Sequence, residues 1–84
     1  MYFFATGHVS RPGDIGPYLE EEKRVLGQLR EEGVVREAFS PADGHGVIGI
    51  LEGPGLSEVQ AQMARLPFVA HGLLTFEYTE VIPL

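Results

Sequence analysis

The 84-residue sequence contains no cysteine and no tryptophan, and only six Lys and Arg residues stand against twelve Asp and Glu. The absence of cysteine excludes disulfides, thiolate catalysis and cysteine-ligated zinc. The formal net charge of −6 repels phosphate backbones and anionic lipids, which argues against nucleic-acid and membrane partners. No apolar run approaches the roughly 20 residues of a membrane span, and no basic leader precedes the first apolar run. We therefore expect a cytoplasmic protein.

What is present is the composition of a small soluble domain, with 44% hydrophobic and 21% charged residues. We expect a single domain over residues 1–84, without linker or low-complexity tract. A chain of this size hides only about 60–65% of its surface on folding. Its own core is therefore thin, and a partner subunit would help to stabilise it.

Residue patterns predict four strands and two helices. The predicted strands are 2–9, 34–40, 47–52 and 72–82, and the predicted helices are 17–32 and 57–66. Pro17 suits the first turn of a helix, Gly33 suits its end, and Pro67 is expected to end the second helix. Ser57 and Gln60 have the spacing of a capping box. The order βαββαβ predicts an α+β, ferredoxin-like domain with a four-stranded antiparallel sheet.

Both faces of the predicted sheet are apolar. In the first strand, Tyr2 and Phe4 point to one face, and Phe3 and Ala5 point to the other. The third strand likewise has Val47 and Leu51 on one face and Ile48 and Ile50 on the other. In the last strand, Leu73 lies opposite Leu74 and Phe76. Two helices in this topology cover only one face. The pattern therefore predicts a second sheet on the open face, and so a homodimer or higher homo-oligomer. The alternative is that these are scattered surface hydrophobes.

Glu22 is one of three consecutive glutamates, and it is the one that a helical projection turns inward. At about 100° per residue, Glu22 lies in the middle of the stripe formed by Leu19, Val25, Leu26 and Leu29, whereas Glu20 lies opposite and Glu21 to one side. A carboxylate in that position is desolvated, which raises its pKa and makes it a better base near neutral pH. The alternative is a structural acid that bends to the rim or pairs with Arg36.

We expect a pocket between the helices and the sheet, walled by the inward stripes. Its predicted lining residues are Tyr18, Glu22, Leu26, Val59 and Met63. His8 shares a strand face with Tyr2 and Phe4, and it either lines a pocket or is an ordinary polar strand end. His8, His45 and His71 lack ligand spacing, so we expect no metal. GHGVIG (44–49) matches the dinucleotide fingerprint in letters, but it stands before a strand instead of opening a helix.

Several segments resemble the muconolactone isomerase family, namely REEGVVRE (30–37), LPFV (66–69) and EVIPL (80–84). DGHGVIGILE (43–52) and PFVAHGL (67–73) are similar to YCII-related proteins. Both families belong to the dimeric α+β barrel superfamily, so the resemblance implies a ferredoxin-like subunit that packs sheet against sheet. It also implies a small-molecule substrate and no cofactor.

The same resemblance implies site residues. Glu22-Lys23, ten residues before Glu32-Gly33, matches the layout of the isomerase general base, while Arg36 and His45 match its arginine and hairpin histidine. From the inward stripes and the strand face described above, the expected substrate contacts are Tyr18, His8, Leu26, Val59 and Met63. The function hypothesis is a cofactor-free isomerase or related proton-transfer enzyme acting on a small lactone, enol or carbonyl metabolite. The alternatives are a non-catalytic dimeric small-molecule-binding or accessory protein, and a cofactor-independent monooxygenase or polyketide cyclase.

Overall fold

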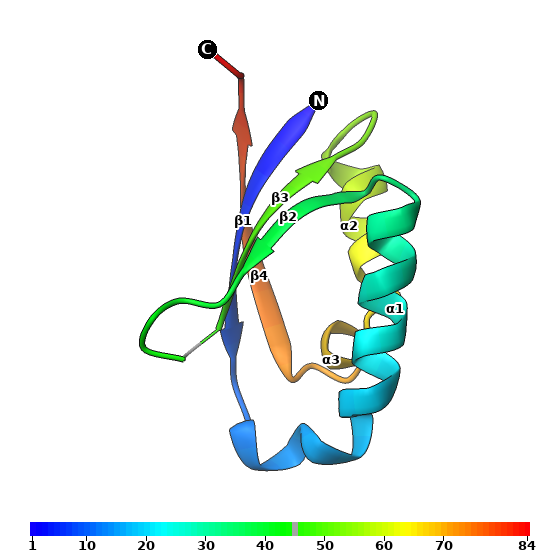
Figure 1. Cartoon of the computed structure of the whole chain (residues 1–84), viewed down its shortest axis with the longest axis vertical. Coiled ribbons are helices and arrows are strands. Elements are labelled where there is room, and N and C mark those ends of the chain that lie inside the picture. Colours follow the sequence, from blue (N-terminus) through cyan, green and yellow to red (C-terminus); the bar gives the residue numbers. More distant parts are fainter. Residues whose placement is uncertain (45) are drawn as a thin grey trace.

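The computed structural model describes residues 1–44 and 46–84 as one antiparallel sheet with helices on one face (Figure 1). Its strands and helices are β1 (Tyr2–Val9), α1 (Leu19–Glu31), β2 (Val35–Phe39), β3 (Val47–Glu52), α2 (Leu56–Met63), α3 (Pro67–Ala70) and β4 (Leu74–Val81). The four strands lie in the order β2-β3-β1-β4, and every neighbouring pair is antiparallel. The predicted ferredoxin-like α+β fold is therefore confirmed.

The first helix begins and ends where its flanking residues favour a boundary. Two short 3₁₀ turns, Pro12–Asp14 and Gly16–Tyr18, lead into α1 and contain Pro17. Gly33 follows the helix with φ of +81°, a conformation that glycine adopts without a side-chain clash. The N–H of Val34 then donates to the carbonyl of Leu29 at 3.0 Å, which satisfies one of the last helical carbonyls.

The second helical segment differs from its prediction at both ends. Its N-cap is Gly55, and Ser57 lies inside α2 and makes no cap hydrogen bond, so the predicted capping box is wrong. Pro67 does follow the end of α2, but it also opens α3, a single helical turn that the sequence did not predict. The two effects of Pro67 have one cause, because proline ends a preceding helix and is also favoured in the first turn of a new one.

The core lies between the helices and the inward face of the sheet. Strand alternation places Phe3 and Ala5 on that face, where they are 2% and 0% exposed. Val25 and Leu29 from α1 and Val59 and Met63 from α2 pack against them. A second cluster consists of Phe68 from α3, Leu73 from the turn that follows, and Leu74 from β4. Leu73 therefore precedes the strand and is buried, whereas the sequence pattern predicts it within the strand on the face opposite Leu74.

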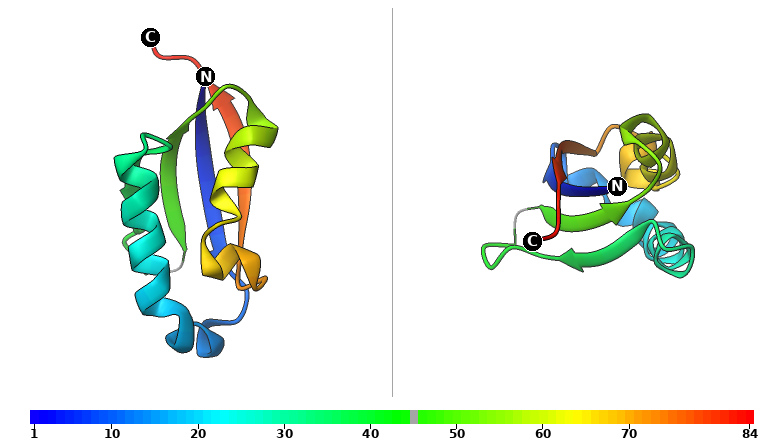
Figure 2. Two further views of the ribbon diagram at one scale, coloured as in Figure 1. Left: turned by 90° about the vertical axis from the view of Figure 1, so that its right-hand side faces the viewer. Right: turned by 90° about the horizontal axis from the view of Figure 1, so that it is seen from above.

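In residues 1–44 and 46–84, no helix covers the other face of the sheet (Figure 2). Phe4 lies beside Ile50, and Phe39 lies beside Ile48, across neighbouring strands. Phe4 is 37% and Phe39 56% exposed. Phe4, Ile48 and Ile50 are among the side chains on which the dimer prediction depends, Phe39 adds to the same face, and the dimer stays a prediction. In the part of the chain that the structure describes, no helix is long and apolar enough to cross a membrane.

Candidate functional site

A small cavity lies between α1, the residues around α3 and the inward face of the sheet. Its volume is about 50 Å³, and Glu22 is the one charged residue among the described residues that line it. Leu26, one turn further along α1, lines the cavity with Glu22 because residues four apart share a helix face. Met63 and Leu66 line it from the α2 side, and β1 and β3 contribute Ala5, Gly49 and Leu51, among others. The cavity is thus apolar except for one carboxylate.

Glu22 is half-buried and is anchored by a backbone group of α3. The N–H of Phe68 donates to Oε1 of Glu22 at 2.9 Å. Phe68 is the second residue of α3, and N–H groups in a first helical turn have no partner inside the helix. Glu22 therefore satisfies an otherwise unpaired donor and links α1 to α3.

Two effects act on the acidity of Glu22. Burial raises the pKa of its carboxyl because the charged form loses hydration, and the hydrogen bond from the Phe68 N–H opposes that rise. Burial is the larger effect. Within residues 1–44 and 46–84, no Lys, Arg or His lies within ion-pair distance of Glu22. The preceding residue, Glu21, shows the opposite case, since Arg24 binds it and lowers the pKa of its carboxyl.

The structure does not bring Arg36 to Glu22. Nη1 of Arg36 lies 3.2 Å from Oε1 of Glu52. Both residues line a larger hollow of about 560 Å³ near the end of α1, and Arg36 does not line the Glu22 cavity. Val35 is buried on the inward face of the sheet, so strand alternation turns its neighbour Arg36 away from the Glu22 cavity. The pairing register of β2 also shifts between Val35 and Glu37. The alternative in which Arg36 neutralises Glu22 is therefore wrong.

The other predicted site residues are distributed over different surfaces. Leu26 and Met63 line the cavity as expected, whereas Val59 is buried in the adjoining core and borders the larger hollow. The ring of Tyr18 stacks on His71 with centroids 4.2 Å apart, outside the cavity. His8 is exposed and alternates with inward-facing Gly7, which places it on the open side of the sheet. His45 lies outside the described residues.

Two features of the cavity were not among the predicted site residues. The donor that anchors Glu22 is a backbone N–H, which any residue except proline provides, so no residue type could indicate it. Leu74 and Phe76 line the cavity from β4. Their alternation predicted that they share one face of the strand, but it did not indicate that this face borders the pocket.

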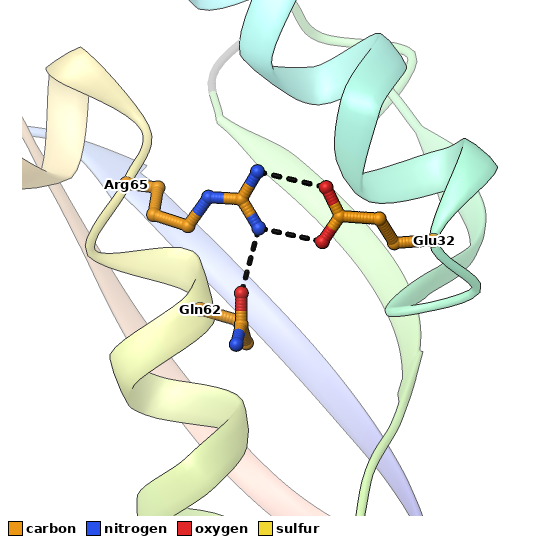
Figure 3. A network of polar contacts seen from close by, with 3 residues as sticks. All are labelled: Glu32, Gln62 and Arg65. Atoms are coloured by element: carbon orange, nitrogen blue, oxygen red, sulfur yellow. Dashed lines mark hydrogen bonds and ion pairs between the residues drawn. The ribbon is translucent and has the colours of Figure 1, made fainter.

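A bidentate ion pair on the outer surface joins residues just beyond the C-terminal ends of α1 and α2 (Figure 3). Nη1 and Nη2 of Arg65 contact Oε1 and Oε2 of Glu32 at 2.7 and 2.9 Å, and Nη1 also donates to Oε1 of Gln62 at 2.7 Å. Hydrogen bonding from Arg65 lowers the pKa of the Glu32 carboxyl. The planar guanidinium matches a carboxylate in this geometry, so the pair helps to fix the spacing of the helices that flank the cavity.

The fold is supported by similarity to solved structures and not by any match to a known sequence. No family model and no curated protein matches the sequence. A crystal structure of muconolactone isomerase superposes with a TM-score of 0.83 at 18% identity, covering 100% of this chain and 91% of the isomerase chain. A 5-chloro-2-hydroxyhydroquinone dehydrochlorinase from Burkholderia phenoliruptrix AC1100, in complex with 2,5-dihydroxybenzoquinone, superposes with a TM-score of 0.71 at 18% identity, covering 98% and 94%. The chain therefore has the ferredoxin-like α+β fold of muconolactone isomerase, as the resemblance of its sequence segments predicted.

Proposed function

We propose that this protein catalyses proton transfer on a small oxygenated metabolite, with Glu22 as the general base and no cofactor. The observation that carries the proposal is the position of Glu22, a half-buried carboxylate that alone gives charge to an apolar cavity. A desolvated carboxylate with a raised pKa is a stronger base than one in water, and general bases work best when their pKa approaches the working pH.

The reaction moves one proton and one electron pair. The Glu22 carboxylate removes a proton from a carbon next to a carbonyl, and the electrons of that C–H bond form an enolate. Protonated Glu22 then returns the proton to another carbon of the conjugated system, which gives an isomer and regenerates the carboxylate. Because Oε1 accepts the Phe68 N–H, we assign the proton transfer to Oε2. The hydrogen bond at Oε1 fixes the orientation of the carboxylate for this transfer.

Lactones, enols and hydroxyquinones are the substrates that suit such a base, because their conjugated carbonyl groups delocalise the negative charge. The two structural neighbours support this class, one being an isomerase of a lactone and the other an enzyme captured with a dihydroxybenzoquinone. Their identity to this chain is 18%, so the substrate class is part of the proposal.

A second candidate function is non-catalytic binding of a small molecule by a dimer. The small volume of the Glu22 cavity, about 50 Å³, argues against turnover there, because it holds only a few water molecules of roughly 10–15 Å³ each. In this alternative the ligand binds away from Glu22, for example in the hollow of about 560 Å³ beside Arg36 and Glu52. In either case we expect the subunits to pair through the open sheet face around Phe4 and Ile50, since that face leaves apolar side chains exposed.

Deuterium exchange separates the two functions. The protein is mixed in D₂O with 2,5-dihydroxybenzoquinone or an unsaturated γ-lactone, and proton NMR follows the loss of the C–H signal. We expect catalysed exchange with at least one compound, and a rate about 10²–10⁴-fold lower for Glu22→Gln. Glu20→Gln, an exposed glutamate two residues away, is the control and should match the wild type. Equal rates for Glu22→Gln and wild type would exclude Glu22 as the base.

A further inference from the structure

The Glu22 cavity is too small for a ring-sized molecule as it stands. Its volume is about 50 Å³, whereas an engineered apolar cavity of about 150 Å³ in another protein accepts benzene. A six-membered ring can therefore reach Glu22 only if part of the cavity wall moves. The side chains that separate the cavity from solvent decide where that opening lies.

On the β4 side the cavity shares part of its wall with a surface groove. A groove of about 300 Å³ runs along the edge of β4 and is lined by Gln60, Val69, Thr75 and Tyr78, among others. Leu74 and Phe76 line both this groove and the inner cavity. Two side chains therefore form the partition between them. β4 is an edge strand that pairs only with β1, so no further strand covers the groove from that side in this chain.

Phe76 is the larger of these two side chains, and its ring rests on a glycine. A Cβ atom placed on Gly7 would lie 2.7 Å from Cε1 of Phe76, closer than two carbon atoms can approach. The neighbouring β1 position thus leaves room for the ring because it carries no side chain. The Phe76 ring also contacts Tyr78, with centroids 5.9 Å apart and planes tilted by 40°.

We propose that the β4-edge groove is a binding site and entrance for a planar, monocyclic, hydroxylated ring, and that Phe76 is the gate between this groove and the Glu22 cavity. As a route for the substrate, the proposal rests on the proposed function; as a binding site, it is measurable without turnover. Leu74 and Val69 supply apolar contact, and the ring of Tyr78 supplies a stacking surface.

Two polar groups of the groove suit a ring hydroxyl or carbonyl. Burial raises the pKa of Tyr78, so its hydroxyl stays protonated at neutral pH and remains a hydrogen-bond donor. Among the described residues, no group forms a hydrogen bond with that hydroxyl. The exposed amide of Gln60 offers a donor and an acceptor in the same groove. A flat ring with one oxygen substituent can therefore satisfy Tyr78 while its face contacts Leu74 and Phe76.

Phenol and toluene test the proposal as a matched pair that differs by a polar group. Binding is followed by ¹H–¹⁵N NMR, with the amides of Gly72 and Thr75 reporting on the groove and those of Glu22 and Gly49 on the cavity. In the wild type we expect phenol to shift the groove amides. Tyr78→Phe should weaken phenol binding about 2–10-fold, the range for one lost hydrogen bond, and should leave toluene binding unchanged.

Phe76→Ala tests the gate. Removing the ring joins groove and cavity, so both probes should shift the cavity amides strongly and bind more tightly than to the wild type. Phe76→Leu keeps an apolar side chain and provides the same comparison if the alanine variant fails to fold. Leu19→Ala, which removes an exposed side chain outside both linings, is the control.

Each outcome has a defined meaning. Phenol shifts that avoid the groove amides, or that are the same in wild type and both Phe76 variants, would overturn the gate. Groove binding that depends on Tyr78 and Phe76 supports it, even if deuterium exchange shows no catalysis. Catalysed exchange that is insensitive to both Phe76 substitutions would leave the general base in place and refute this entrance.

Discussion

Replacement of Glu22 by glutamine and by leucine separates the two roles that the structure gives this residue. Glutamine keeps an oxygen that accepts the Phe68 N–H and removes the charge that burial penalises. Leucine removes both. The two variants therefore test whether the hydrogen bond or the charge dominates the contribution of Glu22 to stability.

The charge of Glu22 makes the folding stability depend on pH, and the direction of this dependence follows from the shift of its pKa. Because the pKa of Glu22 is raised in the folded state, the unfolded chain releases this proton at lower pH than the folded chain. Stability that depends on Glu22 is therefore highest below the ordinary pKa, falls as pH rises toward the folded pKa, and is constant above it. Glu22→Gln has no carboxyl to titrate and does not lose stability in this way. Its stability relative to wild type should therefore increase as pH rises from the ordinary pKa to the folded pKa.

The hydrogen bond from the Phe68 N–H should make the two variants differ in stability, because glutamine keeps it and leucine does not. An unpaired, partly buried N–H costs about 1–3 kcal/mol, and the added apolar burial of a half-exposed leucine offsets about 1 kcal/mol. We therefore expect Glu22→Leu to be about 1 kcal/mol less stable than Glu22→Gln, or roughly 4–8 °C in Tm for a domain of this size.

Thermal unfolding followed by circular dichroism from pH 4 to 8 measures both effects. Protein concentration must be constant, because a dimer has a concentration-dependent Tm. The same substitutions at exposed Glu20 control for helix propensity and surface charge. If wild type gained stability over Glu22→Gln as pH rises, the folded state would favour the carboxylate, and the reasoning from desolvation would be refuted.

Three further predictions follow from the geometry. Ile50→Glu places a charge on the exposed sheet face beside Phe4 and should convert a dimer to monomers in sedimentation velocity; a wild type that is already monomeric at micromolar concentration contradicts the dimer. Arg36→Met should leave deuterium exchange unchanged, since Arg36 pairs with Glu52 and not with Glu22; a large loss of rate would restore Arg36 to the site. Leu29→Ala removes a fully buried side chain and should cost about 2–5 kcal/mol in urea unfolding, whereas Leu19→Ala should cost far less.

Much of the fold follows from local signals in the sequence. Alternation along β1 and the stripe around Leu29 predict which faces are buried, because each residue's direction is fixed by the strand or helix period. Gly33 marks the end of α1 for a local conformational reason. Leu73 was misplaced because apolar residues at a strand boundary give the same letters whether they belong to the turn or to the strand.

The site was less predictable, because it depends on registers between distant segments. The inward position of Glu22 needed only the helical period. The ion pair of Arg36 with Glu52 depends on how β2 and β3 pair, and the register shift in β2 has no marker in single residues. The Phe68 N–H that holds Glu22 lies 46 residues away and comes from a helical turn that was not predicted.

If Glu22 is a desolvated base, a ¹³C NMR titration of its side-chain carboxyl should show this. We expect a Glu22 pKa above the ordinary value of 4.5, while Glu21 in the same spectrum should titrate below it because Arg24 stabilises its charge. Glu22→Gln assigns the signal by removing it. A Glu22 pKa at or below 4.5 would show that the hydrogen bond from Phe68 outweighs burial, and Glu22 would then not be a desolvated base.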